Sequence, residues 1–297
     1  MTTKDKLGIY LMTAKGLAVI KQLLAELGSG RIAFVVVARD AATLYDGSED
    51  ILQVAHEAGI PAFEREQAPE SLPKVRYLLA VSWRWLIPIR TGQQLIVFHD
   101  SLLPRYRGFA PLVSALVNKE TTLGVTALLA STEYDRGPII AQEAIGVNYP
   151  LTVREAIQLI TPCYERLAST LSVMISNNSI EGLPQDETMA SYSLWRDEED
   201  YLVDWSWDAE RIRRFVDGVG YPYKGAAVSV GGKVCRIRLC LELPDVVIEN
   251  RTPGKVIFIE DGMPVVVCGK GLLKVLQLTA DTSGADMLPL AKFRVRF

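Results

Sequence analysis

Short apolar runs alternate with helix-like segments through the first half of this chain, and this alternation restricts the folds that are open to it. The helix-like segments carry apolar residues at helical spacing, over residues 17–27 and 51–58. Residues 13–16 are expected to form a turn. The apolar runs have strand length and few polar residues, as in strands that are covered on both faces; they span 7–12, 31–40, 77–83 and 94–98. The order predicts an α/β fold with a doubly wound, mostly parallel sheet.

A different pattern begins near residue 226. Gly231-Gly232 and Asp261-Gly262 each separate two β-rich runs, which predicts hairpins and hence a small antiparallel sheet or barrel. A helix predicted over 208–217 precedes this region. The 297 residues are enough for two domains, which we place at residues 1–195 and 196–297.

The composition excludes several classes of protein. A net charge of -3 gives no general reason to expect a nucleic-acid coat. The four cysteines lack C-x-x-C spacing and the chain has only two histidines, so we expect buried free thiols and no metal site. The N-terminal residues match neither a signal peptide nor a membrane span, which predicts a cytoplasmic protein without membrane contact.

His99 directly follows the apolar run at 94–98, and Asp135 lies in a loop after another predicted strand, 124–130. The carboxyl ends of parallel strands meet at one edge of a sheet, so we expect the imidazole and the carboxylate to converge on a shared crevice. A histidine beside a carboxylate suits the proton transfers of acyl transfer to an amine. The alternative for His99 taken alone is an ordinary half-buried histidine.

Residues 99–142, "HDSLLPRYRGFAPLVSALVNKETTLGVTALLASTEYDRGPIIAQ", resemble the core of the 10-formyltetrahydrofolate-dependent formyltransferases. Members of that family formylate methionyl-tRNA, glycinamide ribonucleotide or nucleotide-linked amino sugars. The resemblance implies a Rossmann-like catalytic domain, N10-formyltetrahydrofolate as co-substrate, no metal, and catalytic roles for His99 and Asp135. A protonated His99 would then stabilise the oxyanion, and Asp135 would help to remove the proton from the amine.

The same resemblance implies further contacts. The folate would lie beside the loop of Trp85, Leu86 and Ile87 and beside the turn of Ser101, Leu102, Leu103 and Pro104. Core packing is the alternative for Trp83 and Trp85, and a rigid turn that only shapes the pocket is the alternative for residues 101–104. Asp100 is expected either to contact the substrate amine or to cap the turn. Arg105 and Arg107 are expected either to bind a substrate anion or to lie in a solvated loop.

Val97 departs from the family pattern, which has asparagine two residues before the histidine. Valine cannot donate a hydrogen bond, and the loss of one oxyanion donor costs about 3 kcal/mol, or roughly a hundredfold in rate. Three readings remain: a replacement donor such as Ser82 or a backbone amide, a slow or altered transferase, or a protein that binds formylfolate without efficient turnover.

The acceptor amine is predicted from charge and chain length. The basic surplus of the C-terminal part is small and dispersed, which disfavours tRNA. The resemblance disfavours glycinamide ribonucleotide, because that branch of the family normally lacks so long a C-terminal extension. The function predicted first is therefore formyl transfer to a nucleotide-linked amino sugar, with methionyl-tRNA as the second acceptor; the oligomeric state, a homodimer included, stays open. Aromatic and basic residues near the domain junction would bind the sugar nucleotide or else form core: Trp205, Trp207, Tyr221, Tyr223 and Lys224.

Overall fold

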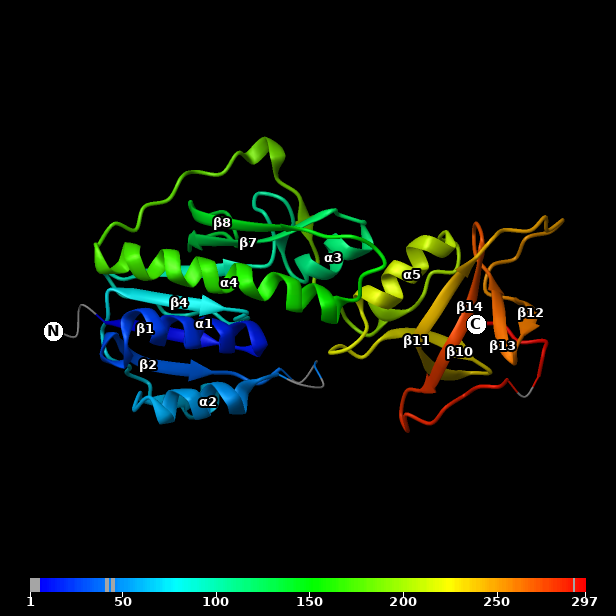
Figure 1. Ribbon diagram of the computed structural model, residues 1–297, viewed down its shortest axis with the longest axis horizontal. Helices are drawn as coiled ribbons and strands as arrows, with labels where there is room; N and C mark the ends of the chain where they lie inside the picture. The colour runs from blue at the N-terminus through cyan, green and yellow to red at the C-terminus, as the bar shows by residue number, and fades with distance from the viewer. Residues whose placement is uncertain (1–5, 41–42, 44–45, 291) are drawn as a thin grey trace. The chain divides into compact units, whose positions relative to one another are not determined.

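The computed structural model describes residues 6–40, 43, 46–290 and 292–297. These residues form two compact units, and Figure 1 shows the elements of each. Unit 1 takes the described residues within 1–112, 122–147 and 157–194. Unit 2 takes those within 113–121, 148–156 and 195–297.

The sheet of unit 1 has seven strands in the order β3-β2-β1-β4-β5-β7-β8. The first five are parallel, whereas β7 and β8 are antiparallel to their neighbours, so the predicted mostly parallel α/β sheet is confirmed. Every residue of β1, β2 and β4 is buried, as their continuous apolar sequences require. The strands are β1 (Leu7–Leu11), β2 (Ile32–Val37), β3 (Ala62–Glu64), β4 (Tyr77–Val81), β5 (Gln94–His99), β7 (Thr122–Leu129) and β8 (Ile139–Gly146).

Helices α1 (Thr13–Leu27), α2 (Ser48–Glu57) and most of α4 (Val153–Ser176) belong to unit 1, whereas most of α3 (Pro111–Val117) belongs to unit 2. The turn predicted at residues 13–16 is wrong, because α1 already begins at Thr13. Gly16 is needed for packing and not for a turn: a Cβ there would lie 3.2 Å from Leu11 Cβ and 3.5 Å from Ile51 Cδ1. The first turn of α1 therefore packs directly on the end of β1.

Unit 2 contains α5 (Ala209–Gly218) and a five-stranded antiparallel sheet in the order β10-β11-β14-β13-β12. Asp208 caps α5 by accepting a hydrogen bond from Arg211 N. Both predicted hairpins are confirmed, since residues 231–232 and 261–262 have positive φ angles. The strands are β10 (Ala226–Val230), β11 (Lys233–Leu243), β12 (Val256–Glu260), β13 (Met263–Val267) and β14 (Leu272–Ala280).

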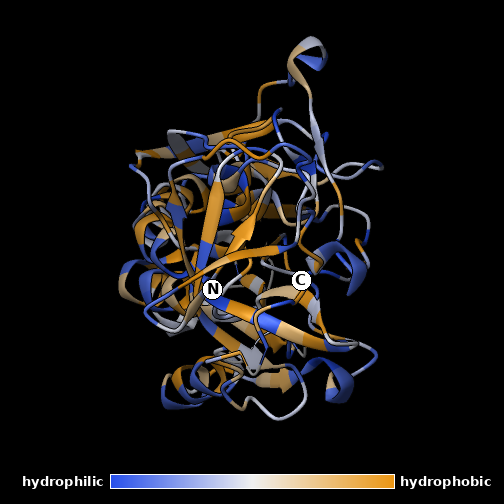
Figure 2. Ribbon diagram, turned by 90° about the vertical axis from the view of Figure 1, so that its right-hand side faces the viewer, coloured by the Kyte–Doolittle hydropathy of each residue, from blue (hydrophilic) through white to orange (hydrophobic). Residues whose placement is uncertain are grey.

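The hydropathy colouring of Figure 2 shows that apolar stretches concentrate in strands, while many loops are polar. The four cysteines are free and buried, as predicted. Within the described ranges, no helix is long and apolar enough to cross a membrane.

Candidate active site

Three neighbouring strands of unit 1 end at one edge of the sheet. Leu11 of β1 pairs with Val81 of β4, which pairs with Phe98 of β5, so Ser82 and His99 follow at adjacent positions. The Thr13 hydroxyl lies 3.2 Å from the Ser82 hydroxyl. The carboxyl edge of the sheet therefore presents two hydroxyl groups at the ends of the strands beside β5, and this edge is where α/β proteins place their binding residues.

His99 and Asp135 are brought together at this edge. His99 Nδ1 lies 3.5 Å from Asp135 Oδ1, and the two side chains are 8% and 15% exposed. His99 Nε2 lies 2.8 Å from the Tyr106 carbonyl oxygen. A carbonyl only accepts, so Nε2 carries a proton and Nδ1 is the nitrogen that faces the carboxylate. The Gly108 amide donates to Asp135 Oδ2 at 2.8 Å and holds that carboxylate in place.

The predicted convergence is thus confirmed, but the reason given for it is wrong. Strand β7 runs antiparallel to β5, with His99 opposite Thr126, so the carboxyl ends of the two strands point in opposite directions. The loop after β7 folds back and carries Asp135 to His99. This path is tight, because a Cβ on Gly137 would lie 1.7 Å from the Leu129 carbonyl oxygen. The two side chains are in contact and do not face each other across an open gap.

Gln185 connects the loops that carry this pair, and sequence reasoning missed it. Its Nε2 donates to the carbonyl oxygens of Asp135 at 2.7 Å and Gly137 at 2.8 Å. Its Oε1 accepts from Arg107, at 2.7 Å from Nη2 and 3.1 Å from Nε. Arg107 precedes Gly108, the residue that binds the Asp135 carboxylate. A single glutamine in a polar connector carries no local pattern that distinguishes it, so only the tertiary contacts reveal this role.

The position of Arg107 differs from both sequence expectations, which were a contact with a substrate anion and a place in a solvated loop. Its side chain is 0% exposed, so it lies in no solvated loop. Its guanidinium donates to both carboxylate oxygens of Glu187, at 2.8 and 2.9 Å, as well as to Gln185, and no direction is left open for a substrate anion. Hydrogen bonds from Arg107 lower the pKa of Glu187 to about 2. Arg105 is exposed, with its guanidinium carbon 5.2 Å from the Tyr106 ring centroid, and its contact with a substrate anion stays a prediction.

Asp100 has a role inside the fold that neither expectation included. Its carboxylate forms an ion pair with Lys15 of α1 and accepts a hydrogen bond from the Tyr164 hydroxyl of α4. Burial alone would raise the pKa of Asp100, but the Lys15 charge and the two hydrogen bonds outweigh burial, and the pKa is lowered. Contact between Asp100 and a substrate amine stays a prediction.

The turn predicted to border the folate follows His99 directly. The Ser101 hydroxyl donates to the Arg105 carbonyl at 2.7 Å, and the Leu103 amide donates to the Thr126 hydroxyl at 3.1 Å. Ser101 and Leu103 are buried, whereas Leu102 and Pro104 are half-buried. These contacts hold the backbone of residues 101–104 in one conformation beside the imidazole.

The second predicted folate segment follows β4, the strand next to β5. Trp85 and Leu86 are exposed and Ile87 is buried. Trp83 packs edge-to-face against Tyr10 and Trp85, so core packing is confirmed for Trp83. The residues around these tryptophans line a cavity of about 230 Å³, with Arg65 and Arg90 among its walls. Within the described ranges, no group of three His, Cys, Asp or Glu residues is placed to hold a metal ion.

A histidine–carboxylate pair at the carboxyl edge of a mostly parallel sheet is placed where α/β enzymes bind and convert their substrates. The family model "Formyl transferase" matches residues 18–161, and "Formyl transferase, C-terminal domain" matches residues 196–289. The chain belongs to the formyl transferase family and is a formyltransferase.

Relatives by sequence include methionyl-tRNA formyltransferases. That of Geobacter sulfurreducens is 28% identical over 258 residues, which is 82% of this chain and 78% of the relative. That of Roseiflexus sp. is 32% identical over 208 residues, 66% of this chain and 59% of the relative.

Similar solved structures include WlaRD, a sugar 3N-formyl transferase, with a TM-score of 0.68, 17% identity, and 92% of this chain and 97% of that chain covered. The N-formyltransferase of Helicobacter canadensis has a TM-score of 0.67 and 16% identity, and the match covers 91% of this chain and 98% of that chain. A variant of HypX of Aquifex aeolicus has a TM-score of 0.59 and 18% identity, and the match covers 93% of this chain but 44% of HypX. At these identities the likeness concerns the fold.

Proposed function

We propose that this enzyme transfers the formyl group of N10-formyltetrahydrofolate to the primary amine of a nucleotide-linked amino sugar. The observation that carries the chemistry is the contact between His99 Nδ1 and Asp135 Oδ1, at 3.5 Å, on the carboxyl edge of the sheet. The sugar acceptor is supported by two structures of similar fold, which were solved with dTDP and 5-N-formyl-THF and with folinic acid and dTDP-3-aminofucose.

In the proposed reaction the amine nitrogen attacks the formyl carbon, and the carbonyl electron pair moves onto oxygen. His99 is proposed to stabilise the developing oxyanion in its protonated form, in which both ring nitrogens carry a proton. Oδ2 of Asp135 is occupied by the Gly108 amide, which leaves Oδ1 to accept the proton of the attacking amine. Collapse of the intermediate returns the electron pair from oxygen and breaks the bond to N10, which takes up the proton that Asp135 accepted from the amine.

The folate is proposed to lie between the turn of residues 101–104 and the loop of residues 85–87. The cavity beside that loop has aromatic and apolar walls, which suit the flat rings of a reduced folate, and two arginines, which suit its glutamate carboxylates. A direct group transfer further requires the acceptor amine to bind beside the formyl group.

Val97 bears on the rate of this reaction. It is half-buried on β5, two residues before His99, so both side chains project from the same face of the strand, and it packs against the apolar cluster there. No amide donor is therefore present at this position. The Ser82 hydroxyl, at the end of the adjacent strand, is the proposed replacement donor.

Methionyl-tRNA remains a second candidate acceptor, because relatives that are 27–32% identical carry that name. The test is to incubate the purified protein with N10-formyltetrahydrofolate and then with a panel of amino-sugar nucleotides or with Met-tRNA, and to identify the products by mass spectrometry. Product from the sugar panel alone supports the proposal, and product from Met-tRNA alone rejects it in favour of the tRNA acceptor. Binding of the folate without product in either arm would mean a formylfolate-binding protein. The His99→Ala variant is the matched control.

A further inference from the structure

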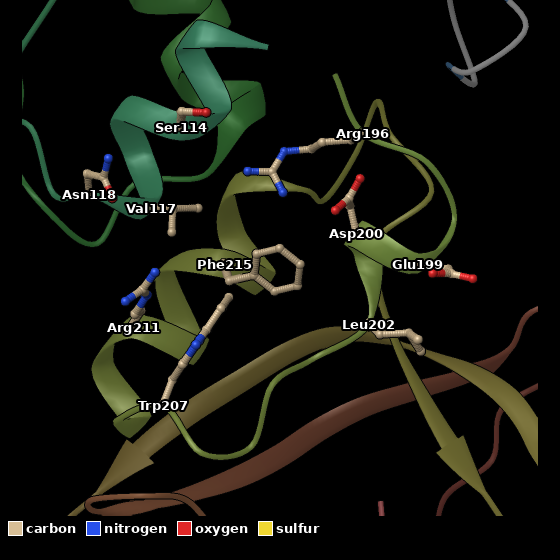
Figure 3. A pocket seen from close by; sticks show the side chains of 10 residues that line it. All are labelled: Ser114, Val117, Asn118, Arg196, Glu199, Asp200, Leu202, Trp207, Arg211 and Phe215. Carbon is tan, nitrogen blue, oxygen red and sulfur yellow. The ribbon is translucent and has the colours of Figure 1, made fainter. Parts of the chain in front are cut away.

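A second cavity, of about 390 Å³, lies entirely within unit 2. Its volume is that of a small-molecule site. None of its lining residues belongs to the active site described above. Figure 3 shows the side chains that line it, and the argument uses six of them: Trp207, Phe215, Arg196, Arg211, Glu199 and Asp200.

Two aromatic rings form one wall of this cavity. Trp207 and Phe215 meet edge-to-face, with ring centroids 5.6 Å apart and planes at 85°. Each ring has a guanidinium beside it: the Arg211 carbon Cζ lies 4.3 Å from the Trp207 centroid, and that of Arg196 lies 6.0 Å from the Phe215 centroid. The wall thus offers flat apolar surface between two positive charges.

These two positive charges form no ion pair with the described residues, although the Asp204 carboxylate interacts with Arg211 at longer range. Arg213 and Arg214, also on α5, form ion pairs with Asp217 and Glu210, whereas in the described part of the chain neither Arg196 nor Arg211 lies within ion-pair distance of a carboxylate. The Nε of Arg196 is buried without a hydrogen-bond partner among those residues. A buried donor without an acceptor is unfavourable, so an acceptor oxygen supplied by a ligand would recover that free energy.

Glu199 and Asp200 provide acceptors on another wall, and Figure 3 shows Asp200 on the same side of the cavity as Arg196. The Asp197 amide occupies one Asp200 oxygen at 2.9 Å. The other oxygen, together with the exposed Glu199 carboxylate, is available to hydroxyl or amino groups. A fitting ligand therefore combines anionic oxygens, a flat ring and hydrogen-bond donors.

We propose that this cavity binds a nucleoside phosphate. The phosphate oxygens accept from Arg196 and Arg211, whose planar guanidinium groups suit phosphate. The base packs against the rings of Trp207 and Phe215, and the sugar hydroxyls or base amino groups donate to the acidic wall. All of these groups lie in unit 2, so the inference stands whether or not the proposed catalytic reaction is correct.

The test is calorimetric titration of the full-length protein with dTDP and UDP, and with thymidine, uridine and pyrophosphate as partial ligands. The nucleotides are expected to bind at least tenfold more tightly than any partial ligand, because the latter satisfy only one part of the cavity. Arg196→Gln and Arg211→Gln are each expected to weaken nucleotide binding at least tenfold. Arg294→Gln, an exposed arginine in the same unit, is the matched control and is expected to bind normally.

Two further measurements separate this site from the catalytic one. His99→Ala is expected to leave nucleotide binding unchanged, and added dTDP is expected to slow backbone hydrogen exchange in residues 196–202 and 207–215. Thermal melting checks that each variant is folded; among the described residues neither arginine forms an ion pair, so neither replacement breaks one. Unchanged affinity in the folded Arg196→Gln and Arg211→Gln variants, or no nucleotide binding at millimolar concentration, overturns the proposal.

Discussion

Replacing Gln185 with leucine is expected to disconnect the two loops of the catalytic pair while leaving His99 and Asp135 themselves intact. The side chain donates to the carbonyl oxygens of Asp135 and Gly137 and accepts from the Arg107 guanidinium. Leucine is of similar size and can do neither. The variant therefore tests whether the position of Asp135 depends on this link.

The size of the effect follows from the bonds that are lost. Two hydrogen bonds between neutral groups contribute about 1 kcal/mol each. The two bonds from the charged guanidinium share one acceptor oxygen, and together they contribute about 1.5–3 kcal/mol. Glu187 still neutralises Arg107, so we expect a loss in unfolding free energy of about 4 kcal/mol. A displacement of Asp135 by about 1 Å is expected to lower kcat by roughly a hundredfold, with a much smaller change in KM.

The assay is steady-state formyl transfer to the acceptor found in the panel, with kcat and KM measured across pH, and a thermal melt for each variant. Gln185→Glu separates the two ends of the link, because it keeps the acceptor for Arg107 but places a carboxylate against two carbonyl oxygens. The kcat of Gln185→Glu is expected to fall as far as that of Gln185→Leu. The control is Gln53→Leu, which removes only a hydrogen bond to Glu57 on the exposed face of α2.

A folded Gln185→Leu variant with kcat within twofold of the unmodified enzyme would refute the reasoning. A fall in activity that merely tracks the unfolded fraction would refute it as well, because the link would then be structural only. Full activity of Gln185→Glu would also refute the reasoning, because glutamate lacks the Nε2 group that donates to the Asp135 loop.

Three further predictions concern other parts of the chain. His99→Ala should abolish single-turnover formyl transfer with little change in melting temperature, and a near-normal rate would remove the role proposed for the imidazole. Val97→Asn should raise kcat, by up to about a hundredfold, because it adds an amide donor on the same face as His99; a fall would mean that the pocket uses a different arrangement. Burial raises the pKa of Asp217 to about 6, so the carboxylate destabilises the fold by up to about 3 kcal/mol above pH 6, and this penalty disappears as the pH falls below about 4. Asp217→Asn should therefore raise the melting temperature at pH 8 but not at pH 4, and an equal change at both would contradict the assignment.

Local patterns predicted most elements of the fold because they depend on neighbours in sequence. Strands such as β2 and β4 are continuous apolar runs, and the turn pair at Asp261 and Gly262 needs the positive φ angles that these residues tolerate. The prediction failed at Gly16, where the absence of a Cβ serves contact with Leu11 and Ile51. A glycine's local sequence does not show which residues of other helices and strands pack against it.

The sequence by itself determined the alternation of strands and helices, the two hairpins, and the place of His99 at the end of a strand, since each depends on the period of apolar residues or on turn chemistry over a few positions. The tertiary structure alone decided that β7 runs antiparallel to β5, that Asp135 returns to the imidazole through a loop, and that Gln185 holds Arg107. These depend on which distant segments pack together, and in a low-dielectric interior the pairing of buried polar groups is set by those contacts.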